Sequence, residues 1–184
     1  WACRRLVPAV STPDVRRNRP RRYMVPSEWG PPPQVENVFV AEDLLAHKYC
    51  HSVHFWDLRA RKHVQTIDRG ANHQRSLEIR PAHDPAREYG FLGVVVDTTN
   101  LEGSIWTWYR ENGKFQIKKT ATIPPEPADA SKLPALLKGF GAVPPLISDI
   151  DLSLDDSFLH VACCGPGAVR QYDVSAHVKP TPAG

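Results

Sequence analysis

The chain has 184 residues, a formal net charge of +3, and 41% hydrophobic against 23% charged residues. This length suits one domain or a large part of one, and the composition excludes a disordered chain. The sequence has no run of about 20 apolar residues, so it predicts no transmembrane helix. Proline is over-used, with 18 residues, about twice the usual share of ~5%, which argues against an all-helical bundle.

The charge is divided unevenly along the chain. Residues 1–22 contain seven arginines and a single acid, Asp14, whereas the remainder carries a net charge of -3. We interpret residues 1–22 as a solvated, disordered basic arm, since blocks of like charge usually are, and we expect no nucleic acid partner. Residues 1–10 lack the long apolar segment of a signal peptide, so secretion is not supported.

The first half of the chain predicts one short helix and several strands. Residues 41–48 have a helix-like composition, and they follow a proline-rich turn. Residues 53–57 and 64–67 flank a charged turn and predict a hairpin. Residues 90–96, Gly-Phe-Leu-Gly-Val-Val-Val, are rich in β-branched side chains and bounded by glycine. This pattern predicts a strand buried on both faces.

The second half predicts two further groups of strands. Residues 104–110 lead through Asn112-Gly113 into residues 115–123, and Asn-Gly between two apolar runs is the strongest short-range hairpin signal. A proline-broken connection over residues 124–145 then precedes the last group. That group has three expected strands, over residues 147–154, 158–163 and 169–174.

A strand with a large aromatic residue recurs in each group, over residues 53–58, 104–109 and 169–174. The spacing of about 50–65 residues favours propeller blades over a sandwich, whose turns come every ~8–12 residues. The sequence therefore predicts an all-β partial β-propeller of about three blades. We expect Trp106 and Trp108, which share one face of a strand, to fill the space between sheets.

Four cysteines are present, Cys3, Cys50, Cys163 and Cys164, without the spacing of a zinc site. We expect free thiols in a cytoplasmic protein. Cys163 and Cys164 are adjacent, so in a strand they point to opposite faces and do not ligate one metal together.

Several strings closely resemble the selenium-binding protein or methanethiol oxidase family, of a bacterial rather than an animal type. Together they cover residues 23–175, with residues 176–184 as a divergent tail. The resembling strings lie at residues 27–30, 51–58, 65–67, 77–85, 89–91, 104–106, 148–150, 152–156 and 170–175.

The resemblance implies a cytosolic, seven-bladed propeller that oxidises methanethiol with O2 and depends on histidine-bound copper. It also implies a longer chain, because the family's paired histidines, its selenium-associated cysteine and its carboxy-terminal segment have no counterpart here. Cys164 stands where the family has an aromatic residue. We therefore expect a central fragment that is inactive alone. The alternative is a non-catalytic propeller that binds a protein partner or sequesters selenium or a soft metal.

Among eight histidines, His83 is the best candidate metal ligand, together with Glu78 of the same motif. Two prolines restrict the loop around His83, and Asp84 could orient its ring. The alternative is a loop histidine with a structural hydrogen bond. Cys163 and Cys164 are the candidates for selenium or thiol chemistry, whereas catalytic residues cannot be assigned.

Other polar residues have weaker claims to a functional role. Asp149 and Asp151 share one face of a strand and could bind a cation, or simply be solvated. His51 and His54 face opposite sides of a strand and are expected not to chelate together. His47 and His73 are expected in loops. Asp155-Asp156 is expected to form a turn.

Overall fold

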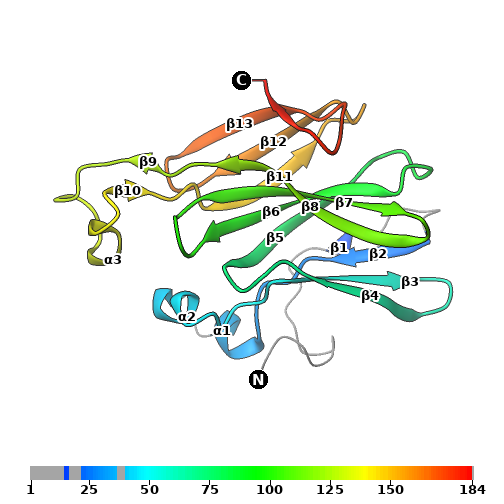
Figure 1. The fold of residues 1–184 in the computed structure, drawn as a ribbon, viewed down its shortest axis with the longest axis horizontal. Helices are drawn as coiled ribbons and strands as arrows, with labels where there is room; N and C mark the ends of the chain where they lie inside the picture. Colours follow the sequence, from blue (N-terminus) through cyan, green and yellow to red (C-terminus); the bar gives the residue numbers. More distant parts are fainter. Residues whose placement is uncertain (1–14, 17–21, 37–39, 184) are drawn as a thin grey trace.

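The computed structural model describes residues 15–16, 22–36 and 40–183, and this part of the chain is dominated by antiparallel strands. Three four-stranded sheets follow one another along the chain, each a simple up-and-down arrangement, and a small two-stranded sheet is inserted before the third. Figure 1 shows the three sheets stacked in chain order as successive layers. Successive four-stranded antiparallel sheets that stack face to face are the blades of a propeller, so the fold is a partial β-propeller and each sheet is a blade.

The first blade confirms the first predicted hairpin, and two short helices lie between its second and third strands. The β3–β4 hairpin has a register shift between Phe55 and Trp56, a β-bulge that bends the ladder locally. The elements are β1 (Val15–Arg16), β2 (Tyr23–Pro26), α1 (Pro32–Glu36), α2 (Ala41–Leu45), β3 (Ser52–Asp57) and β4 (Lys62–Asp68).

The second blade contains the strand predicted to be buried on both faces, and every residue of that strand, β6, is buried. The predicted Asn112-Gly113 turn joins β7 to β8, with φ of 50° and 78° at its two residues. Both lie in the left-handed region that such a two-residue hairpin requires. The strands are β5 (His73–Pro81), β6 (Tyr89–Asp97), β7 (Gly103–Glu111) and β8 (Lys114–Ile123).

The third blade confirms the three strands expected near the carboxyl end. A fourth strand comes from within residues 176–184, which therefore extend the blade instead of forming a separate tail. The proline-broken connection forms a short hairpin with a helix at its tip. The elements are β9 (Glu126–Pro127), α3 (Ala135–Lys138), β10 (Ala142–Val143), β11 (Ile147–Leu152), β12 (Phe158–Cys163), β13 (Ala168–Asp173) and β14 (Thr181–Pro182).

Two of the three apolar clusters in the described part of the chain lie against the two faces of the middle blade. Trp106 and Trp108 pack with Phe55 of the first blade, which confirms that they fill the space between sheets. The opposite face of the second blade packs against the third, where Ile147 approaches so closely that a Cβ on Gly93 would lie 2.7 Å from it. The alternation of strand side chains thus gives the middle blade two buried faces.

The expectation that His73 lies in a loop is wrong, because this residue begins β5. Strand β5 is the first strand of the middle blade and packs against β11, the first strand of the next. Its polar composition and a register shift between Ser76 and Ile79 hide the two-residue alternation. The basic arm predicted over residues 1–22 lies mostly outside the described residues. In the described part of the chain, no helix is long and apolar enough to cross a membrane.

Candidate functional site

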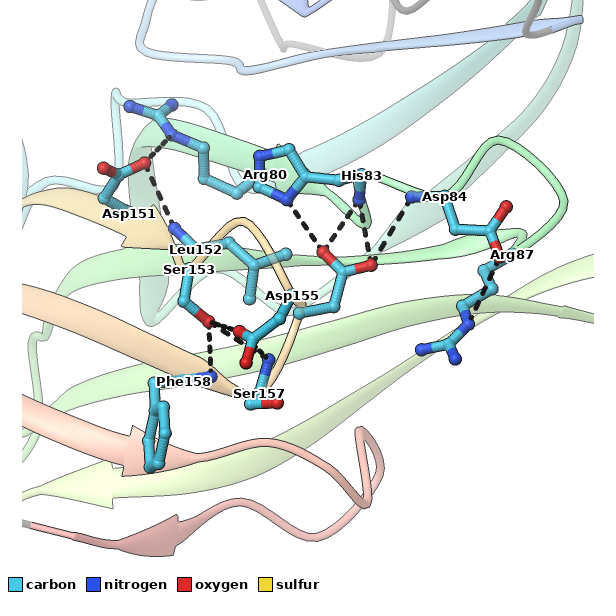
Figure 2. Close-up of polar contacts among 11 residues, drawn as sticks. Arg80, His83, Asp84, Arg87, Asp151, Leu152, Ser153, Asp155, Ser157 and Phe158 are labelled. Carbon is cyan, nitrogen blue, oxygen red and sulfur yellow. Dashed lines mark hydrogen bonds and ion pairs between the residues drawn. The ribbon is translucent and has the colours of Figure 1, made fainter.

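The loop after β5 and the turn after β11 meet, and His83 and Asp156 form the contact between them (Figure 2). The Asp156 carboxylate accepts a hydrogen bond from the His83 backbone N–H, with an N–Oδ1 distance of 2.8 Å. The Nδ1 atom of the His83 ring also lies 2.8 Å from Oδ1. The carboxylate therefore fixes both the loop backbone and the orientation of the imidazole, the arrangement that positions many functional histidines.

The turn that presents Asp156 is built by its neighbours. Asp155 accepts a hydrogen bond from the Ser153 hydroxyl, with an O–O distance of 2.6 Å, and this bond contributes most to lowering the pKa of Asp155. Asp156 has φ of 60°, a left-handed conformation that aspartate tolerates better than most residues. The predicted Asp155-Asp156 turn is thus confirmed, and the two acids differ in role: Asp155 shapes the turn, while the buried Asp156 reaches across to the neighbouring blade.

The prediction that Asp84 orients the His83 ring is wrong. Oδ1 of Asp84 accepts a hydrogen bond from the Ala86 backbone at 2.9 Å, and its Oδ2 lies 3.6 Å from the Arg87 guanidinium. Asp156 takes the expected place of Asp84 beside the ring. Because Asp156 is 73 residues away in the sequence, its role follows from the packing of two blades and not from the local motif.

The acidic pair Asp149 and Asp151 lies beside the guanidinium of Arg80. Arg80, on β5, lies 3.3 Å from a carboxylate oxygen of each aspartate, and it also pairs with Glu78 of its own strand. The guanidinium is largely buried, whereas the aspartates are exposed. Three carboxylates therefore surround one arginine where the first strands of two blades adjoin, and Glu78 is engaged with this arginine.

Copper prefers imidazole or sulfur ligands that converge on one centre. Asp156 engages Nδ1 of His83, the arrangement that orients Nε2 of a metal-binding histidine, whereas Glu78 is paired with Arg80. Across the described residues, no group of three or more His, Cys, Asp or Glu side chains is arranged to hold a metal ion.

The described cysteines differ in whether they form a disulfide and in how exposed they are. Cys50 is disulfide-bonded, so the expectation of four free thiols is wrong for this residue. Cys163 and Cys164 are free. Cys163 is buried, and burial raises the pKa of its thiol, whereas Cys164 is exposed and its Sγ lies 2.8 Å from the Ser148 hydroxyl. The neighbouring thiols therefore do not share one face, as the strand pattern predicted.

A buried carboxylate on the first blade was not predicted from the sequence. Glu28 lies 3.1 Å from Nε2 of His54, whose Nδ1 is 2.9 Å from the Thr66 hydroxyl. His51 lies instead beside Asp68, so His51 and His54 have separate partners, as expected. No local signal connects Glu28 with His54, since 26 residues separate them.

Comparison with known proteins shows the family of this chain. A family model for the 56kDa selenium binding protein matches residues 7–184, a wider range than the resembling strings. The chain belongs to the selenium-binding protein family. The match includes much of the arginine-rich beginning and all of the carboxyl-terminal segment, so these ends are part of the family's sequence pattern.

Relatives and a solved structure agree with this assignment. The chain is 37% identical to a methanethiol oxidase of Xenopus laevis over 83% of its length and 33% identical to one of Danio rerio over 88%. It spans only 30% and 33% of these relatives. A hypothetical selenium-binding protein from Sulfolobus tokodaii superposes with a TM-score of 0.86 at 43% identity, covering 93% of this chain and 37% of that one.

Proposed function

We propose that this chain is a portion of a methanethiol oxidase, which converts methanethiol, O2 and water into formaldehyde, hydrogen sulfide and hydrogen peroxide. The observation that carries the proposal is the similarity, over more than four fifths of the chain, to curated relatives that bear this name. A cytoplasmic location and a complete ring of seven blades are part of the proposal.

The chain's own contribution is to build and join blades. The Asp156–His83 contact locks the loop of one blade to the turn of the next, and Arg80 does the same for the first strands of both blades. Asp156 would orient His83 so that its Nε2 could be one ligand of a copper in the longer protein, whose other ligands would come from residues outside the described part.

The test compares the purified 184-residue chain with a longer family protein that contains it. Each is supplied with methanethiol, O2 and copper, and hydrogen sulfide and hydrogen peroxide are followed together. We expect turnover only by the longer protein, which should hold stoichiometric copper. Turnover by the shorter chain that is abolished by His83→Ala would overturn the assignment. Absence of activity from a folded, copper-loaded longer protein would overturn the proposed function itself.

A non-catalytic role in sequestering selenium or a soft metal is the second candidate, and the exposed thiol of Cys164 favours it. One thiol supplies only one soft ligand. Stoichiometric capture of selenite or Cu(I) by the longer protein, lost in Cys164→Ser and accompanied by no methanethiol turnover, would support this role. Equal capture by the variant would exclude Cys164 from it.

A further inference from the structure

A polar cleft of about 550 Å³ lies along one side of the middle blade, next to the loop that carries His83. We name it the His177 cleft after His177, one of the residues that line it. This volume is within the range of small-molecule sites. The cleft is lined by residues 86–89 before and within β6, by Tyr109 and Arg110 of β7, and by Ser175 and His177 of the segment after β13.

The aromatic wall of the cleft is held rigidly. The His177 ring stacks on Tyr89, with ring centroids 4.2 Å apart and planes 15° from parallel, and Tyr109 meets it edge to face at 6.4 Å. The Thr107 hydroxyl donates a hydrogen bond of 2.8 Å to the His177 carbonyl. A wall that is ordered before binding lowers the entropic cost of taking up a ligand.

The charge of the cleft is positive. Arg87 and Arg110 line it with Glu88 as the single acid, so the lining carries an excess of one positive charge. Arg110 pairs with Glu88 at 3.1 Å through Nη1, while its Nε is buried without a hydrogen-bond partner. Nη2 of Arg110 also donates to the Gly113 carbonyl at 3.5 Å. Because a guanidinium has five N–H donors, these two acceptors leave part of the donor capacity of Arg110 unused.

We propose that the His177 cleft binds a small aromatic oxyanion, with its anionic group on Arg87 and Arg110 and its ring against Tyr109 and His177. Guanidinium groups pair well with phosphate and carboxylate oxygens. The flat aromatic side chains complement a flat ligand body. The cleft borders the His83 loop through Arg87, which lies 3.6 Å from Asp84, but it includes neither His83 nor Asp156.

The test measures binding of phenyl phosphate, inorganic phosphate and neutral benzyl alcohol to the purified chain by isothermal titration calorimetry. We expect phenyl phosphate to bind most tightly, inorganic phosphate more weakly, and benzyl alcohol not at all. Arg87→Gln should weaken phenyl phosphate binding about tenfold or more, because a charge-assisted contact is lost. Arg59→Gln is the matched control, since Arg59 is an exposed arginine outside the cleft, and it should change nothing.

A second variant separates the aromatic wall from the charges. Tyr109→Leu should weaken phenyl phosphate several-fold and leave inorganic phosphate unchanged, with circular dichroism confirming that the fold is kept. Failure of phenyl phosphate to bind at concentrations on the order of 10 mM would overturn the proposal. Any remaining affinity would then correspond to a binding free energy of less than about 3 kcal/mol. Equal losses in Arg87→Gln and Arg59→Gln would also overturn it, since they would show general charge attraction only.

Discussion

Replacing Asp156 should destabilise the protein more than replacing its partner His83. The Asp156 side chain is 4% exposed and that of His83 is 43% exposed. Asp156→Ala removes the acceptor of the His83 backbone N–H and of the His83 ring. An unsatisfied buried donor costs about 1–3 kcal/mol, and alanine at a φ of 60° adds about 1 kcal/mol.

The expected loss of unfolding free energy for Asp156→Ala is therefore about 2–4 kcal/mol, equivalent to a fall in Tm of roughly 4–16 °C for a chain of this size. Asp156→Asn keeps a residue that tolerates left-handed backbone and keeps one carbonyl acceptor, so it should cost about 1–2 kcal/mol. His83→Ala removes only the half-exposed ring contact and should cost about 1 kcal/mol.

Urea unfolding followed by tryptophan fluorescence measures these three variants against the parent, at one low protein concentration. The three losses should fall in the order Asp156→Ala, Asp156→Asn, His83→Ala. A loss of less than about 1 kcal/mol for Asp156→Ala, or a larger loss for Asp156→Asn than for Asp156→Ala, would refute the conclusion that the buried carboxylate joins the two blades.

Two further predictions concern backbone packing and pH. Gly90→Ala should destabilise the fold by about 1–3 kcal/mol in urea unfolding, since the new Cβ would lie 2.6 Å from a backbone oxygen of β5. Gly139→Ala, with no atom within 4 Å of the new Cβ, should leave stability nearly unchanged, and equal losses would contradict the packing argument. Burial, followed by Arg87, lowers the pKa of His177 below its ordinary 6.5. The unfolded chain therefore takes up a proton at higher pH than the folded chain, so stability should decline as pH falls through about 6.5. His177→Gln should reduce this decline in Tm across roughly pH 7 to 5, whereas a larger reduction in the exposed His160→Gln would show that other groups control it.

The blade hairpins were predictable because their signals are local. Asn112-Gly113 specifies a turn through two residues that accept left-handed backbone, and the β-branched run over residues 90–96 specifies a strand buried on both faces. Strand β5 was not recognised as a strand, because its polar residues and a register shift between Ser76 and Ile79 interrupt the two-residue alternation. The family resemblance was also carried by local strings, and it is confirmed over residues 7–184.

The sequence by itself therefore determined most of the long strands, the turns of the hairpins and the membership of a propeller family, since each depends on neighbouring residues. Only the tertiary structure decided which polar groups meet. It paired His83 with Asp156 across 73 positions, and it placed Arg80 between Asp149 and Asp151. The physical reason is that these contacts arise from stacking one blade on the next, and stacking depends on the shape of whole sheets, which no short segment of sequence encodes.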